Sequence, residues 1–117
     1  MISIEILRSE NNCIRSVNAE GHACWDLKGN DIVCAAVSND LRTAAQLLER
    51  AEGITIDGAS KNKGSLFFTV TMIEKEKTEW MRGVSDFLIH SLTKLERDFP
   101  HEISVQLSVF KELENGT

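Results

Sequence analysis

One histidine and one cysteine in the first third of the chain have the residue types and spacing that thiol catalysis requires. Eleven residues separate His22 from Cys34, which is enough chain to fold back and bring imidazole and sulfur within hydrogen-bond reach. Cys34 stands at or just inside the start of a predicted helix, where free N–H groups and the positive dipole end favour a thiolate. We therefore expect Cys34 to be a nucleophile and His22 its general base.

Two alanines, Ala35 and Ala36, directly follow the cysteine. Their backbone N–H groups would offer hydrogen bonds to the oxyanion that forms when the sulfur attacks a carbonyl carbon. Their small side chains also leave room for the backbone of a substrate. The sequence therefore predicts an oxyanion- or substrate-binding role for both.

Asp31 and Ser38 flank the cysteine and could support the site. Asp31 either orients His22 or caps the helix, and spacing does not decide between the two. Ser38 lies on the same helical face as Cys34, one turn further on, where a hydrogen bond would help hold the site together. Spacing alone also leaves purely structural roles open for the cysteine and the histidine.

The chain has three cysteines, and an odd number in a reducing compartment is not typical of a disulfide framework. We expect Cys13 and Cys24 to be passive thiols. An alternative is a zinc site made of His22, Cys24 and Cys34, with water as the fourth ligand. No C-x-x-C pair supports that alternative, so we expect no cofactor and no metal.

Composition indicates one domain over residues 1–117, with 42% hydrophobic and 26% charged residues. The net charge of −5 argues against a nucleic-acid partner and would suit a basic polypeptide. Glu5 and Arg8 interrupt any apolar stretch at the start, which indicates no signal peptide. We expect a cytoplasmic protein without a membrane-spanning segment.

Periodicity predicts the order β-β-α-β-β-α-β, an α+β domain with two helices packed on a largely antiparallel sheet. The first hairpin runs from Ile2 to Glu20, and a helix extends from about Val33 until Gly53 stops it. The remaining predicted elements are strands at 54–56 and 65–73, a helix at 78–97 and a strand at 101–110. In the second helix we expect one stripe to cover the sheet: Trp80, Val84, Phe87, Leu88, Ser91 and Leu95.

The segment from Gly21 to Ser38 reads GHACWDLKGNDIVCAAVS and resembles the signature of the bacterial ribosomal-processing cysteine proteases. The resemblance lies in GHA at its start, the glycine at 29 and DIVCAAVS at its end. It extends over almost the full length, because the two hairpins, the motif helix and the final helix–strand pair match that family's layout.

This resemblance implies that Cys34 and His22 form a catalytic dyad and that Gly21, Asp31 and Ser38 support it. It implies that the loop between the dyad residues is mobile and orders over substrate; Ala23, Trp25 and Gly29 lie in that loop.

The family's task is to remove a short N-terminal extension from large-subunit ribosomal protein number twenty-seven, in support of ribosome assembly. Cleavage follows a pair of phenylalanines, which implies an apolar pocket beside the nucleophile, and homodimers are typical. We therefore expect a cysteine endopeptidase that works through a thioester acyl-enzyme. The alternative from another class is a non-catalytic ribosome-assembly module that grips a basic peptide.

Overall fold

A computed structural model describes residues 1–21, 31–58 and 65–111, including their side chains except that of Asp31. The chain opens with strands β1 (Ile2–Ser9) and β2 (Ile14–Glu20), which pair antiparallel. Isoleucines at alternate positions of β1 are buried, while the residues between them are exposed. Asn12 takes the left-handed conformation in the turn, with φ of 69°. The predicted first hairpin is therefore confirmed.

Five strands form one sheet in the order β3-β4-β2-β1-β5. The later strands are β3 (Ile54–Asp57), β4 (Ser65–Ile73) and β5 (Ile103–Phe110). Only the β1–β5 pair is parallel among these strands; the other three pairs are antiparallel. The predicted α+β class, with a largely antiparallel sheet, is confirmed.

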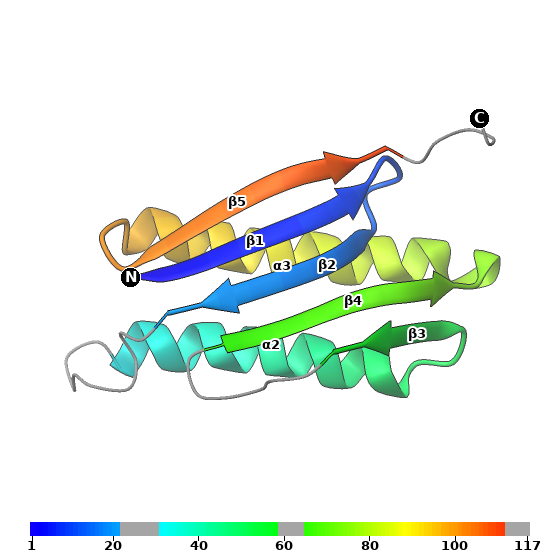
Figure 1. The fold of residues 1–117 in the computed structure, drawn as a ribbon, viewed down its shortest axis with the longest axis horizontal. Coiled ribbons are helices and arrows are strands. Elements are labelled where there is room, and N and C mark those ends of the chain that lie inside the picture. Colours follow the sequence, from blue (N-terminus) through cyan, green and yellow to red (C-terminus); the bar gives the residue numbers. More distant parts are fainter. Residues whose placement is uncertain (22–30, 59–64, 112–117) are drawn as a thin grey trace.

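Two long helices, α2 (Asp31–Arg50) and α3 (Thr78–Asp98), cover one face of this sheet (Figure 1). A short 3-10 turn, η2 (Lys75–Lys77), leads into α3. Helix α2 starts two residues earlier than predicted, and the chain reverses beyond its end at Gly53, whose φ is +84°. Neither of these helices is long and apolar enough to cross a lipid bilayer.

The sheet-facing side of α3 differs from the predicted stripe. The buried residues of the helix are Met81, Ser85, Leu88 and Leu92. Phe87, in contrast, is 74% exposed, and Trp80 also reaches solvent. The prediction is confirmed for Leu88, which is buried, and Val84 and Leu95 pack against the core. It was wrong for Trp80 and Phe87, because apolar residues also lie on a neighbouring face of α3 that does not pack on the sheet. Residues of the other face line an exposed hollow between the helices, together with Leu47 of α2.

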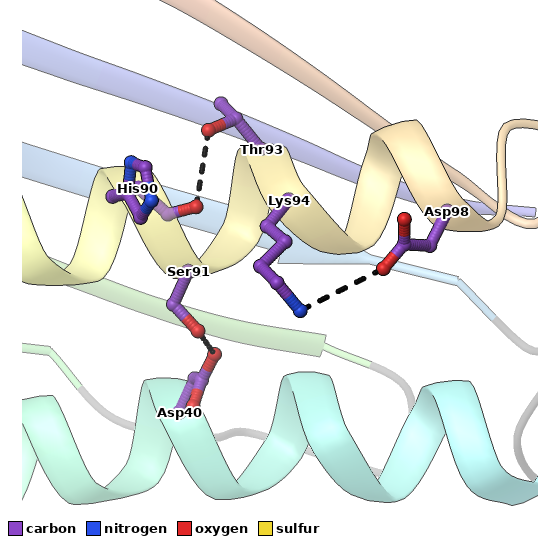
Figure 2. Close-up of polar contacts among 6 residues, drawn as sticks. All are labelled: Asp40, His90, Ser91, Thr93, Lys94 and Asp98. Atoms are coloured by element: carbon purple, nitrogen blue, oxygen red, sulfur yellow. Dashed lines mark hydrogen bonds and ion pairs between the residues drawn. The ribbon is translucent and has the colours of Figure 1, made fainter.

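A hydrogen bond links the two helices on their outer side (Figure 2). The Ser91 hydroxyl donates to Oδ2 of Asp40 at 2.5 Å. The other contacts drawn there lie within α3. The Thr93 hydroxyl donates to the carbonyl oxygen of His90, and Nζ of Lys94 lies 3.8 Å from Oδ2 of Asp98. The Asp40–Ser91 bond thus helps fix α2, the helix that carries Cys34, against α3.

Candidate active site

Cys34 is the fourth residue of α2 and lies on the face of the helix that packs on the sheet. It is 6% exposed and belongs to the core together with Val33 and Val37. Strand β2 ends at the same end of the sheet at which α2 begins (Figure 1). In an α-helix each Cα–Cβ bond tilts toward the N-terminus, so the sulfur of Cys34 is directed back toward the first turn.

Gly21 follows β2 and lies against the backbone at the start of β1. A Cβ atom at this position would stand 2.7 Å from the Cα of Ile2 and 2.8 Å from the carbonyl oxygen of Met1. Both neighbours are backbone atoms that cannot rotate away, so no larger residue fits without moving β1. The glycine therefore fixes where the chain leaves the sheet, one residue before His22.

The start of α2 at Asp31 changes which N–H groups can serve an oxyanion. In a regular α-helix, the N–H groups of Ala35 and Ala36 donate to the carbonyls four residues earlier, at Asp31 and Ile32. Helical N–H groups without an intrahelical partner belong to the first turn, before Cys34. The predicted helix started two residues later, at Val33, so the sequence did not indicate these unpaired N–H groups.

Ser38 lies one turn beyond Cys34 and is half-buried, whereas Ala35 is exposed. Asp31 opens α2, and its side chain is outside the described part of the structure. These positions agree with the predicted layout around the cysteine. The roles assigned to these residues remain predictions.

Several predicted site residues lie outside the described residues: His22, Ala23, Trp25 and Gly29. The approach of the imidazole to the sulfur therefore stays a prediction, as does the apolar pocket beside Cys34. The zinc alternative also stays untested, because two of its three ligands, His22 and Cys24, are in the same segment.

The sulfur of Cys34 is disulfide-bonded in this structure. We expected free thiols, so that prediction was wrong for this residue. A chain with three cysteines can still form one disulfide, because that bond uses two of the sulfurs. Among the described residues, Cys13 is a free thiol. A disulfide sulfur cannot attack a carbonyl, so Cys34 must be reduced before it can act as a nucleophile.

Cys13 has the environment of a structural thiol. It is 1% exposed, and its sulfur contacts the carbonyl oxygen of Thr78 at 3.7 Å. Burial raises the pKa of the Cys13 thiol above its ordinary value of 9.0, although Arg82 and Arg15 act in the opposite direction. A protonated, buried sulfur reacts slowly, which agrees with the passive role expected for Cys13.

The fold is a five-stranded sheet covered on one face by two helices, with Cys34 in the first turn of α2. The family model of cysteine protease Prp matches residues 1–104, and the chain belongs to that family. The predicted family and enzyme class are thereby confirmed. The chain has no significant sequence match among curated proteins.

Solved structures share this fold. The crystal structure of SMU.848 from Streptococcus mutans is 22% identical and has a TM-score of 0.75, covering 94% of this chain and 96% of that one. The essential ribosomal processing protease Prp from S. aureus, with a covalently linked product peptide, is 20% identical with the same TM-score. That match covers 92% of this chain and 100% of the other. The same S. aureus protease with a substrate peptide is 18% identical, with equal coverage and TM-score.

Proposed function

We propose that this protease is an endopeptidase that removes the N-terminal extension of large-subunit ribosomal protein number twenty-seven. Membership of the Prp family supports this proposal, as do the S. aureus structures of a ribosomal processing protease with substrate and product peptides. The observation that carries it is the position of Cys34 in the first turn of α2, beside the end of β2 that leads to His22.

In the proposed mechanism, His22 takes the proton of the reduced Cys34 thiol, and the thiolate attacks the scissile carbonyl carbon. Collapse of the tetrahedral intermediate breaks the C–N bond, and His22 protonates the departing amine. The extension then remains on Cys34 as a thioester. Water, deprotonated by His22, attacks that thioester and releases the extension with a new carboxylate.

We assign the developing oxyanion to N–H groups of the first turn of α2, at Ile32 and Val33, because these have no partner within the helix. The positive end of the helix dipole acts on the same charge. Ala35 and Ala36 then contribute small side chains beside the substrate. We assign Gly21, Asp31 and Ser38 to the support of this arrangement.

A cleavage assay on a ribosomal protein that carries its extension tests the proposal. Reduced wild-type protein should shorten the substrate, and Cys34→Ala should lower the rate roughly a thousandfold or more. His22→Ala should lower it by roughly 10²- to 10⁴-fold. Cys13→Ala is the matched control, because it makes the same substitution at a cysteine outside the site. Unchanged cleavage by Cys34→Ala would refute the mechanism.

We also propose that the protein works in the cytoplasm as a homodimer, on the strength of the family resemblance and of a ribosomal substrate. Multi-angle light scattering on the purified protein tests the dimer directly. A mass of one chain at micromolar concentration would contradict it.

A further inference from the structure

Among the described strands, β5 lies at one edge of the sheet and pairs with β1 alone. Its sequence contains no charged residue and no proline, and no bulge interrupts its pairing with β1. Natural edge strands carry such features because they block pairing with another chain. The opposite edge has them, because β3 is four residues long, ends on Asp57 and has an irregular register with β4. Of the two edges of the described sheet, β5 is therefore the one open to a further strand.

Two hydrogen bonds show which backbone groups of β5 point away from the sheet. The carbonyl oxygen of Glu102 accepts the first N–H of β1 at 2.9 Å, so this carbonyl points toward β1. The N–H of Val105 points the other way and donates to Oε2 of Glu96 at 2.9 Å. Because backbone groups alternate in direction along a strand, the N–H groups of Leu107 and Val109 share the direction of Val105. Neither has an acceptor among the residues that the structure describes.

The side chains near the end of β5 are uncovered as well. Ile103 is buried and Val105 packs against the core, both on the side of the sheet that the helices cover. Leu107 and Val109 continue this alternate row, yet they are 41% and 53% exposed. The reason is visible in Figure 1, where β5 diverges from α3 toward its C-terminal end. Free N–H groups and uncovered apolar side chains thus belong to the same two residues.

We propose that the β5 edge pairs antiparallel with the β5 edge of a second copy of this chain, with Ser108 opposite Ser108 of that copy. The proposal rests on the proposed homodimer and identifies its interface. In this register Leu107 lies opposite Val109 of the second copy, and two-fold symmetry gives the reciprocal pair. Each pair exchanges two N–H···O=C bonds, so the free N–H groups of both chains gain acceptors and one sheet runs through the dimer.

Charge and position favour a second copy over other occupants of this edge. Each chain has a net charge of −5, so two copies repel least along a surface without charge. The register also places Lys111 of one copy opposite Val105 of the other, beside the carboxylate of Glu96. A substrate strand on this edge would lie far from Cys34, because Phe110 and the start of α2 are at opposite ends of the sheet (Figure 1).

Disulfide cross-linking tests the register. The Cα atoms of a directly opposed pair without mutual hydrogen bonds stand about 4.5 Å apart, within the reach of a disulfide. Ser108→Cys should therefore give a covalent dimer on mild oxidation, seen by non-reducing electrophoresis and located by peptide mass spectrometry. Gln106→Cys is the matched control, because its two copies lie about 13 Å apart along the paired strands and should not link to each other. Equal yields of linked peptide from both variants would refute the register.

Light scattering over a range of protein concentrations tests the surface. Val109→Lys should raise the dissociation constant of the dimer at least about tenfold, because lysine on an edge strand opposes pairing. Phe87→Lys, at an exposed apolar residue of α3, is the control and should leave the dimer intact. Lys111→Glu places a carboxylate beside Glu96 and should raise the constant roughly 2- to 30-fold. Adding Glu96→Gln should recover part of that loss, since the glutamine oxygen still accepts the N–H of Val105.

Two results would overturn this interface: a dimer that Val109→Lys leaves intact, or one that Phe87→Lys dissociates. In both cases the proposed homodimer would stand, with its contact on another surface. A wild-type protein that stays monomeric would refute the homodimer and the interface together. Cleavage through Cys34 is measured separately, so the proposed activity does not depend on either outcome.

Discussion

The backbone N–H of Ile14 donates to the hydroxyl oxygen of Ser85 at 2.9 Å, in the interior between β2 and α3. Ser85 is fully buried, with 0% exposure, and is one of four α3 residues that face the sheet. The hydroxyl is a buried acceptor for this N–H. This bond therefore fixes which side of α3 packs against β2.

Ser85→Ala should destabilise the protein by about 1–3 kcal/mol, because it leaves the buried N–H of Ile14 without an acceptor. Urea unfolding monitored by circular dichroism measures this change. Ser108→Ala, at an exposed position of β5, is the control and should change stability by less than about 0.5 kcal/mol. Equal effects of the two substitutions would contradict the role given to Ser85.

The orientation of α3 predicts opposite outcomes for two adjacent apolar residues. Leu88→Ala should cost about 2–5 kcal/mol, because Leu88 is buried against the sheet. Phe87→Ala should cost less than about 0.5 kcal/mol, because most of that ring already contacts water. Chemical denaturation of both variants checks the orientation, and a larger loss for Phe87→Ala would show that the helix faces the other way.

Two glycines should respond in opposite directions to the same added methyl group. Gly21→Ala forces a Cβ against the backbone of Ile2 and should destabilise the protein by roughly 1–3 kcal/mol and slow cleavage. Gly83→Ala, in the interior of α3, adds a Cβ that meets nothing within 4 Å apart from the neighbouring backbone of its own helix, and should stabilise by about 0.5–1 kcal/mol. Thermal unfolding of both variants tests this; a Gly21→Ala protein as stable and active as wild type would be the contrary result.

Burial of Cys13 predicts a loss of stability at alkaline pH. Because its pKa is raised in the folded state, the thiol stays protonated there while the unfolded chain ionises near pH 9.0. Its stabilising contribution is complete below that pH and is lost as the pH rises through the pKa of the folded state. The difference in unfolding free energy between wild type and Cys13→Ala should therefore shrink above pH 9.0. A constant difference over that range would argue against the raised pKa.

The sequence predicted the strands and the C-terminal ends of the helices well, because local rules set them. Alternation placed Ile4 and Ile6 in the core, and Gly53 marked where the chain reverses after α2. The packed face of α3 could be predicted only in part: Leu88 belongs to the predicted stripe, but Ser85, a buried polar residue, does not. No local pattern indicates that Ser85 must serve an N–H 71 positions away in the chain.

At the site, the family motif identified Cys34 and its place near a helix start. It did not give the exact start: because α2 begins at Asp31, the N–H groups of both alanines have partners within the helix, and those without one precede Cys34. The oxidation state of the sulfur was also beyond the sequence, because a cysteine count says nothing about which sulfurs meet in space.

In the proposed mechanism, reduced Cys34 forms a thioester with the extension that it removes. Acid quenching of the reaction, followed by intact-protein mass spectrometry, tests it most directly. The account predicts a transient protein species heavier by the mass of the extension less one water, with the adduct on Cys34 and sensitive to hydroxylamine. Cleavage that proceeds at the same rate in Cys34→Ala, with no adduct in wild type, would contradict it.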